Sequence, residues 1–136
     1  MKRQLLLSID DDPAIRKLVG GLAERAGFDW IEAGDPGTID QALDRQPDVI
    51  VLDLTMPGMD GNEVLWALKQ RSSRAAIIIS SGFVDVCVQT AVLYAVKAGL
   101  NYAGRLDKPY APGELLALFA NIGLCHGNRE NQHVQP

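Results

Sequence analysis

Short apolar-rich runs alternate with amphipathic segments along the chain. The runs carry β-branched and aliphatic residues and end at acids, glycines or prolines, which is typical of short buried strands. They predict strands over residues 5–9, 28–33, 49–52 and 76–80, and a weaker fifth strand over 103–106. The segments between them space their apolar residues three and four apart, as amphipathic helices do. They predict helices over 13–26, 38–45, 62–70, 84–98 and 112–122.

Local signals support these helix and loop boundaries. Asp12 is a good N-cap, Pro13 fits the first helical position, and Gly27 is suited to the end of the same helix. The segment 84–98 is ambiguous, because its first valines alternate at the period of a strand, but its length favours a helix. The segment 55–61 is rich in Pro and Gly and predicts a loop.

Alternating strands and helices predict an α/β fold. Apolar strands joined by helical crossovers form a parallel sheet with helices on both faces, so we expect a doubly wound (βα)5 domain. Residues 1–123 form this single domain in our interpretation. Residues 124–136 are mostly polar, and we expect a frayed C-terminal tail.

Composition narrows the classes of function. The chain has 136 residues, 47% of them hydrophobic, and 13 Lys and Arg against 17 Asp and Glu leave a net charge of −4. This balance disfavours direct nucleic-acid binding, which needs clustered cations. Two distant cysteines support neither a disulfide framework nor a zinc site, and no apolar stretch is long enough to span a membrane. We therefore expect a cytoplasmic protein.

Polar side chains follow the predicted strands at the ends where ligands bind in open α/β sheets. Asp10 and Asp11 follow the first strand, Asp53 the third, Ser81 the fourth and Lys108 the fifth. The strands were assigned from apolar runs alone, so this coincidence is independent support for a site.

The chemistry of this set points to phosphoryl transfer. Two like charges 4 Å apart repel by about 4 kcal/mol at an effective dielectric constant of 20, and a divalent cation relieves that repulsion. Oxygen ligands suit Mg²⁺, or Mn²⁺ in its place. Lys108 is a candidate countercharge, Ser81 a hydrogen-bond donor to an anion, and Gly82 leaves room beside it. A carboxylate in these surroundings is a plausible nucleophile toward phosphorus.

Four motifs in order resemble those of response-regulator receiver domains, the CheY-like domains of two-component signalling. They are Ile9-Asp10-Asp11-Asp12-Pro13, the segment from Asp53 through Met56-Pro57-Gly58-Met59-Asp60-Gly61, Ser80-Ser81-Gly82, and Lys108-Pro109-Tyr110. The resemblance extends from about residue 4 to about residue 122. It implies the flavodoxin-like strand order 2-1-3-4-5 and a switch that is not an enzyme beyond assisting its own phosphorylation and dephosphorylation.

The resemblance also implies a role for each matched residue. Asp53 accepts a phosphoryl group from a kinase histidine. Asp10, Asp11, Asp53 and the backbone carbonyl of Thr55 hold Mg²⁺. Ser81, Gly82 and Lys108 contact the phosphoryl group, and a cis peptide bond is usual before the proline that stands here as Pro109.

One position departs from the common pattern of the family. Three residues before the lysine, where Tyr or Phe is frequent, this chain has Arg105. We therefore treat Arg105, Pro109 and Tyr110 as candidate switch and output residues. Thr55 and Phe83 flank the approach to Asp53 and are candidates for tuning the rates.

The leading interpretation is a phosphorylation switch whose partners are a sensor histidine kinase or phosphotransfer protein and a downstream effector or fused domain. A homodimer through the face of the fourth helix, fifth strand and fifth helix is a further expectation. The alternatives are a docking module that works without phosphorylation and an excised N-terminal receiver of a larger regulator, such as a cyclic-di-GMP enzyme. A haloacid-dehalogenase-type phosphohydrolase is disfavoured by Thr55, where those enzymes have a second Asp. A nucleotide- or flavin-binding domain is disfavoured by acids where a glycine-rich turn is needed.

Overall fold

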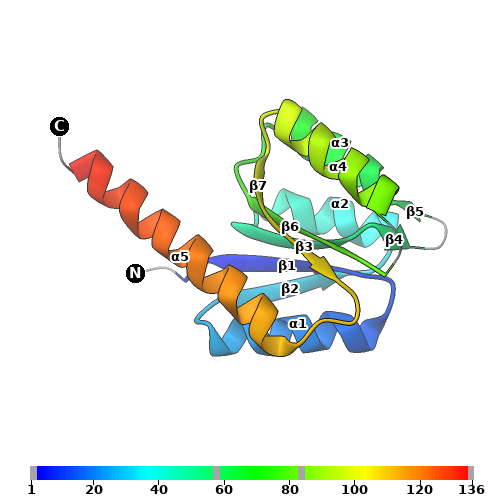
Figure 1. The fold of residues 1–136 in the computed structure, drawn as a ribbon, viewed down its shortest axis with the longest axis horizontal. Helices are drawn as coiled ribbons and strands as arrows, with labels where there is room; N and C mark the ends of the chain where they lie inside the picture. Colours follow the sequence, from blue (N-terminus) through cyan, green and yellow to red (C-terminus); the bar gives the residue numbers. More distant parts are fainter. Residues whose placement is uncertain (1–2, 57–58, 83–84, 135–136) are drawn as a thin grey trace.

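The computed structural model describes residues 3–56, 59–82 and 85–134, and it forms a three-layer α/β domain (Figure 1). The central sheet contains β1 (Leu5–Ile9), β2 (Asp29–Ala33), β3 (Val49–Asp53), β6 (Ala76–Ser81) and β7 (Asn101–Asp107). Its order is β2-β1-β3-β6-β7, and every neighbouring pair is parallel. Since β6 and β7 are the fourth and fifth strands of this sheet, the predicted fold and strand order are confirmed.

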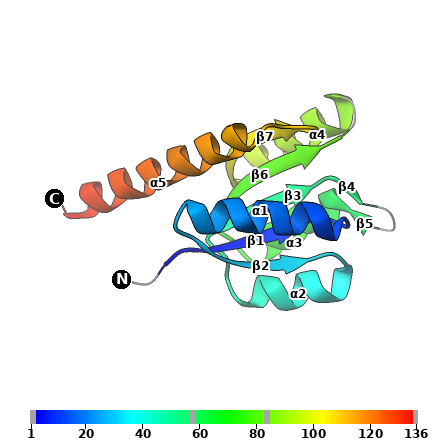
Figure 2. The ribbon, with the colours of Figure 1, turned by 90° about the horizontal axis from the view of Figure 1, so that it is seen from below.

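Helices cover both faces of the sheet (Figures 1 and 2). They are α1 (Pro13–Arg25), α2 (Pro36–Asp44), α3 (Gly61–Gln70), α4 (Asp85–Lys97) and α5 (Pro112–Val134). α1 and α5 lie on one face, and α2, α3 and α4 lie on the other. Among the residues described, no helix combines the length and apolar character needed to cross a bilayer.

Alternation along each strand divides the core between these faces. On β1, Leu6 packs with α1 and α5, whereas Leu7 packs with α2, α3 and α4. Successive side chains of a strand point to opposite faces of the sheet. Because helices cover both faces, successive residues of a central strand are all buried. This explains why the central strands appear in the sequence as unbroken apolar runs.

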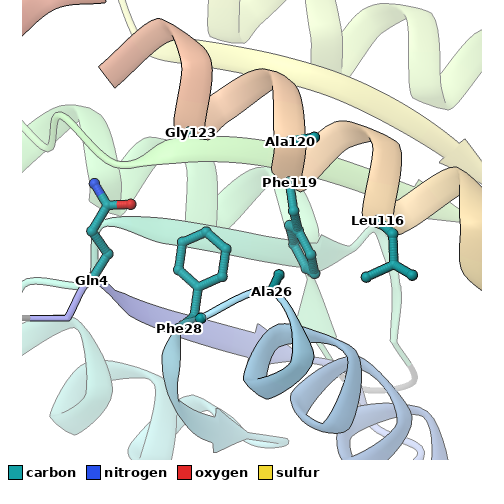
Figure 3. A pocket seen from close by; sticks show the side chains of 8 residues that line it. Gln4, Ala26, Phe28, Leu116, Phe119, Ala120 and Gly123 are labelled. Carbon is teal, nitrogen blue, oxygen red and sulfur yellow. The ribbon is translucent and has the colours of Figure 1, made fainter. Parts of the chain in front are cut away.

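The end of the sheet opposite the strand carboxyl termini is closed by aromatic packing between α5 and the segment that joins α1 to β2. The rings of Phe28 and Phe119 lie 5.3 Å apart with their planes tilted by 58°. With Gln4 and Leu116 they line a pocket at the C-terminal end of α1 (Figure 3). The carboxyl ends of β1 and β3, where Asp10, Asp11 and Asp53 lie, are therefore at the other end of the sheet from this pocket.

Three predicted segments differ from the structure in type or in length. The segment expected to be a loop contains a two-stranded antiparallel hairpin, β4 (Thr55–Met56) and β5 (Met59–Asp60). The fifth strand of the main sheet is seven residues long, and its pairing with β6 is irregular between Ile77 and Ile78. α5 continues to Val134 instead of ending at residue 122, and its second half extends beyond the sheet (Figure 1). The domain boundary at residue 123 stays a prediction.

Candidate functional site

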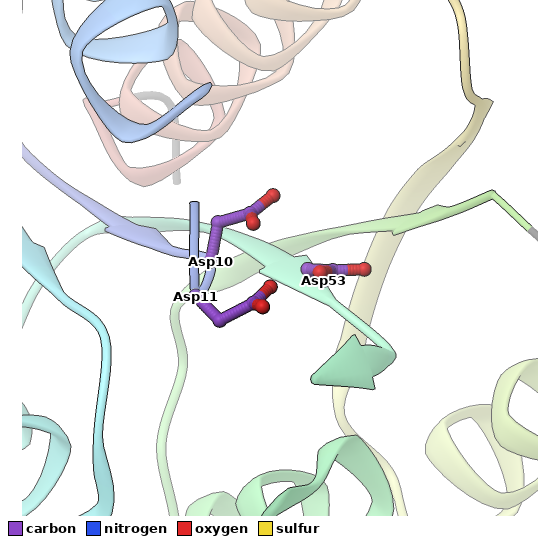
Figure 4. A group of neighbouring side chains, drawn as sticks. All are labelled: Asp10, Asp11 and Asp53. Carbon is purple, nitrogen blue, oxygen red and sulfur yellow. The ribbon is translucent and has the colours of Figure 1, made fainter. Parts of the chain in front are cut away.

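Three carboxylates meet where β1 and β3 end. Asp10 and Asp11 follow β1, Asp53 is the last residue of β3, and one oxygen from each lies within 4.8 Å of the others (Figure 4). Asp10 and Asp53 are buried, with 3% and 2% of their surface exposed, whereas Asp11 is exposed. The adjacent strands β1 and β3 thus present their acids to one shared space that opens to solvent at Asp11.

Lys108 lies against the two buried carboxylates. Its Nζ is 2.7 Å from Asp10 Oδ2 and 3.5 Å from Asp53 Oδ2. The lysine comes directly after β7, and its backbone N–H donates to the Ser81 carbonyl at 2.8 Å, which fixes the start of its turn against β6. The peptide bond from Lys108 to Pro109 is cis, as the resemblance implied.

Each buried carboxylate is also held by the turn that follows it. The Asp12 backbone N–H donates to Asp10 Oδ1 at 2.9 Å, and the Thr55 backbone N–H donates to Asp53 Oδ1 at 3.0 Å. Such contacts to the residue two positions on are a usual way for Asp to order a turn. In both acids, Oδ1 is thereby used by the backbone and Oδ2 faces the lysine.

Burial and charge perturb the titration of this cluster. Burial raises the pKa of Asp53 from 3.8 to about 6, and the negative charge of Asp10 adds to this rise. The hydrogen bond from the Thr55 N–H and the positive charge of Lys108 oppose it. Burial lowers the pKa of Lys108, but the hydrogen bond to Asp10 and the charges of both acids outweigh burial and raise it. The Asp53 carboxylate is therefore unusually basic for an aspartate, while Lys108 remains charged.

Two hydroxyl groups lie beside the acids. Thr55 Oγ1 and Ser81 Oγ are 3.3 Å apart, so the first residue of β4 and the last residue of β6 are neighbours. Gly82 is exposed, and a Cβ at this position would lie 3.9 Å from Lys108 Cβ. The phosphoryl-contacting set predicted from the sequence is thus gathered at the same edge as the acids.

Comparison with known proteins identifies the family. The sequence profile named "Response regulator receiver domain" matches residues 6–120. The chain belongs to this family. It is therefore a receiver domain of two-component response regulators.

Similar proteins include both short and long members of that family. The receiver is 29% identical to the chemotaxis protein CheY of Bacillus subtilis over 113 residues, which are 82% of this chain and 90% of CheY. It is 32% identical to NtrC of Klebsiella pneumoniae over 134 residues, 97% of this chain and 27% of NtrC. It is 29% identical to MtrA of Mycolicibacterium smegmatis over 116 residues, 85% of this chain and 48% of MtrA. The chain thus spans about half of MtrA and about a quarter of NtrC.

Solved structures of the same family agree with this fold. A response regulator from Colwellia psychrerythraea superposes with a TM-score of 0.75 at 26% identity, covering 89% of this receiver and 97% of that chain. CheY4 of Vibrio cholerae superposes with a TM-score of 0.73 at 25% identity, covering 89% and 99%. The strand order and the helices on both faces are therefore those of the family.

The predicted output residues lie outside the acid cluster. Arg105, on β7, donates through Nε to Asp107 Oδ1 at 2.7 Å. Pro109 is exposed, and the buried hydroxyl of Tyr110 has no hydrogen-bond partner among the residues described. Phe83, predicted to tune the rates, lies outside the described residues.

Sequence reasoning missed one residue that contacts the site. Arg16, on the first turns of α1, donates through Nη1 to the backbone carbonyl of Asp10 at 2.8 Å. An arginine in an amphipathic helix next to an acidic turn is a weak signal, because most such residues are solvated. The contact becomes visible only when α1 is placed against β1 and β2.

The donor set of the cluster fits a hard divalent cation. Three carboxylates supply anionic oxygen ligands, and the exposed side of Asp11 leaves room for the waters that Mg²⁺ retains. The site contains neither the thiolates nor the histidines that would favour a softer metal. Asp10, Asp11 and Asp53 are the side chains that could hold Mg²⁺, and the carbonyl of Thr55 is the additional ligand that the family implies.

Proposed function

We propose that this receiver accepts a phosphoryl group on Asp53, with Mg²⁺ held by Asp10, Asp11, Asp53 and the backbone carbonyl of Thr55. The observation that carries the proposal is the position of the Asp53 carboxylate. It is buried, has a raised pKa, and lies beside two further acids and 3.5 Å from the Lys108 ammonium. A surface turn aspartate would have none of these neighbours.

The chemistry is an exchange of one bond at phosphorus. Asp53 Oδ2 attacks the phosphorus of a phosphohistidine, a P–O bond forms, and the P–N bond breaks with its electron pair leaving on the imidazole. Mg²⁺, when bound, offsets the charge that builds on the phosphoryl oxygens. Lys108 and Ser81 then contact the new anion. The raised basicity of Asp53 favours its attack, because nucleophilicity rises with basicity.

Phosphorylation acts as a switch because it adds negative charge beside Lys108. The phosphoryl group competes with Asp10 for the Lys108 ammonium, and the end of β7 that carries Lys108 responds. Water later hydrolyses the acyl phosphate, so the domain resets without acting on any other substrate. Thr55, exposed beside Asp53, is placed to tune that hydrolysis, and we assign Phe83 the same role.

The partners follow from the same proposal. A sensor histidine kinase or a phosphotransfer protein supplies the phosphoryl group, and a downstream effector protein or fused domain reads the result. Leu93 and Val96 on α4 are more than half exposed, which supports a partner or second copy on the face of α4, β7 and α5.

A docking module that works without phosphorylation is the second candidate. Arg105 supports it, because an arginine paired with Asp107 replaces the aromatic side chain that is frequent at this position. In that case the acid cluster would be present, but phosphorylation would not change the binding of a partner.

The proposal is tested by intact mass after incubation with acetyl phosphate, with and without Mg²⁺, on the wild type and on Asp53→Asn. We expect one phosphoryl group on the wild type, only with Mg²⁺, and none on the variant. Binding of beryllofluoride with Mg²⁺ is the second measurement, because some receivers do not accept small phosphodonors. If the protein neither gains mass nor binds beryllofluoride, the switch is wrong and the docking module is favoured.

A further inference from the structure

Arg16 connects the acidic turn to the strand beside it. Its Nη1 donates to the backbone carbonyl of Asp10 at 2.8 Å, and its Nε donates to Glu32 Oε1 on β2, also at 2.8 Å. The Arg16 side chain is 18% exposed, so this is not a freely solvated pair. A planar guanidinium can hold two acceptors in a fixed geometry, which an ammonium cannot.

Space for this contact exists because residue 34 is glycine. A Cβ at Gly34 would lie 2.3 Å from Arg16 Nη1 and 3.0 Å from Arg16 Cζ. Any other residue would therefore displace the guanidinium. The other close neighbour of that Cβ is the carbonyl oxygen of Asp10 itself, at 3.2 Å.

Asp10 is thereby restrained by four contacts. Arg16 holds its carbonyl, the Asp10 N–H donates to the Ala33 carbonyl at 3.3 Å, the Asp12 N–H donates to Oδ1, and Lys108 holds Oδ2. The lysine has to change partners when a cation and a phosphoryl group arrive, whereas the three contacts that involve the backbone can persist. Arg16 and Ala33 therefore hold the backbone, and Asp12 holds the carboxylate, when Lys108 leaves Asp10.

We propose that Arg16 is a positioning residue for the divalent-cation site: through the Asp10 carbonyl it holds the β1–α1 turn in the geometry that binds Mg²⁺. The inference rests on the proposed function only for the identity of the cation. Arg16 touches neither a reacting atom nor, through its side chain, the carboxylates that bind metal. Outer contacts of this kind typically change metal affinity ~10-fold or more when they are removed.

Electrostatics alone predicts the opposite sign. Arg16→Gln removes a positive charge near the acids and leaves Glu32 without its partner, so a purely electrostatic role would tighten Mg²⁺ binding. Loss of positioning weakens it. Gly34→Ala separates the two effects further, because it changes no charge: its Cβ takes the space of the guanidinium and approaches the Asp10 carbonyl oxygen to 3.2 Å.

The test titrates Mg²⁺ into four variants by isothermal calorimetry, with urea unfolding of each in parallel. The variants are Arg16→Gln, Gly34→Ala, the double variant, and Arg71→Gln as the control. Arg71 makes a pair of the same 2.8 Å length with Asp44, away from the site. A second measurement is amide hydrogen exchange at Asp10 and Asp12 without metal.

We expect Arg16→Gln and Gly34→Ala each to weaken Mg²⁺ binding ~10-fold and to speed exchange at Asp10 and Asp12, with Arg71→Gln unchanged in both. In the double variant the two effects should add to clearly less than their sum, since the guanidinium that Gly34→Ala displaces is gone and only the contact of the new Cβ with the Asp10 carbonyl remains. Unchanged or tighter Mg²⁺ binding by Arg16→Gln, or full additivity in the double variant, overturns the inference. If the wild type binds no Mg²⁺, the proposed function is wrong, and the exchange rates alone then decide whether Arg16 positions the turn.

Discussion

Replacing Asp53 with asparagine should stabilise the metal-free receiver at neutral pH. In the folded protein, burial raises the pKa of this carboxyl to about 6. The folded state therefore binds the Asp53 proton more tightly than the unfolded chain, in which the pKa is near 3.8. Between these two values the folded state carries more protons, so stability falls as the pH rises. Asparagine resembles the neutral carboxyl and cannot ionise.

The size of the effect follows from the same shift. A rise from 3.8 to about 6 corresponds, at 1.36 kcal/mol for each pKa unit, to ~3 kcal/mol of destabilisation above pH 7. The side chain is 3% exposed, so solvent screening reduces this value little. The penalty is absent only well below pH 3.8, where Asp53 is protonated in both states.

The assay is urea unfolding of the wild type and Asp53→Asn in chelator, at several pH values from 4 to 7.5. We expect an advantage for the variant of only ~0.5 kcal/mol in the free energy of unfolding at pH 4, which grows to ~3 kcal/mol by pH 7.5. Acids far from Asp53 contribute equally to both proteins and cancel in the difference. A difference that does not change with pH, or a variant that is less stable at pH 7.5, would refute the reasoning.

Two further predictions concern the lysine and the packing of α1. Lys108→Met should cost ~2 kcal/mol at pH 7.5 in chelator, because it leaves Asp10 and Asp53 buried without their cation. The cost should shrink below pH 6, where Asp53 takes up a proton; urea unfolding at pH 7.5 and below pH 6 checks it, and a cost that is independent of pH would contradict it. Gly20→Ala should destabilise the protein by ~1–3 kcal/mol, since its Cβ would lie 2.3 Å from the Trp30 ring. Gly21→Ala in the same helix meets nothing within 4 Å and should stabilise it by up to ~1 kcal/mol; thermal unfolding of the pair decides, and equal shifts would contradict the packing argument.

The fold was predictable where the sequence pattern and the burial agree. β3 and β6 are buried at every position, and each appears as an unbroken apolar run up to the polar residues at its carboxyl end. β7 was predicted too short because it pairs irregularly with β6, and Gly104 faces Leu118 so closely that a Cβ would lie 2.6 Å from Leu118 Cδ2. Tertiary packing, which local periodicity does not encode, selected the residue at that position.

The two other boundary errors have different physical causes. The hairpin of β4 and β5 has two residues in each strand, which is too short for any period to register. The helical pattern of α5 ends at Ile122, where glycine and polar residues follow, yet the backbone stays helical to Val134. Hydrophobic periodicity identifies the part of a helix that packs on the sheet, and α5 continues beyond that part.

The gathering of the acids was predictable because it depends on topology alone. Parallel strands end at one edge, so residues that follow β1, β3, β6 and β7 had to meet there. The contacts among them were not predictable, because they depend on where each turn is held. Arg16 is the clearest case: its partner is a backbone carbonyl, and its space depends on a glycine 18 positions further along the chain.

The two cations at Asp10 differ in a way that matches the role we propose for each. Lys108 holds the carboxylate through a single ammonium, 23% exposed, on a flexible side chain that can exchange Asp10 for another anion. Arg16 holds the carbonyl through a guanidinium that is simultaneously fixed to Glu32 and confined by Gly34. If the two residue types were exchanged, a rigid guanidinium would hold the carboxylate that the proposed switch has to release. A mobile ammonium would then hold the carbonyl of the β1–α1 turn that has to stay in place. The position of each residue type therefore supports an acidic turn that keeps its geometry while its countercharge moves.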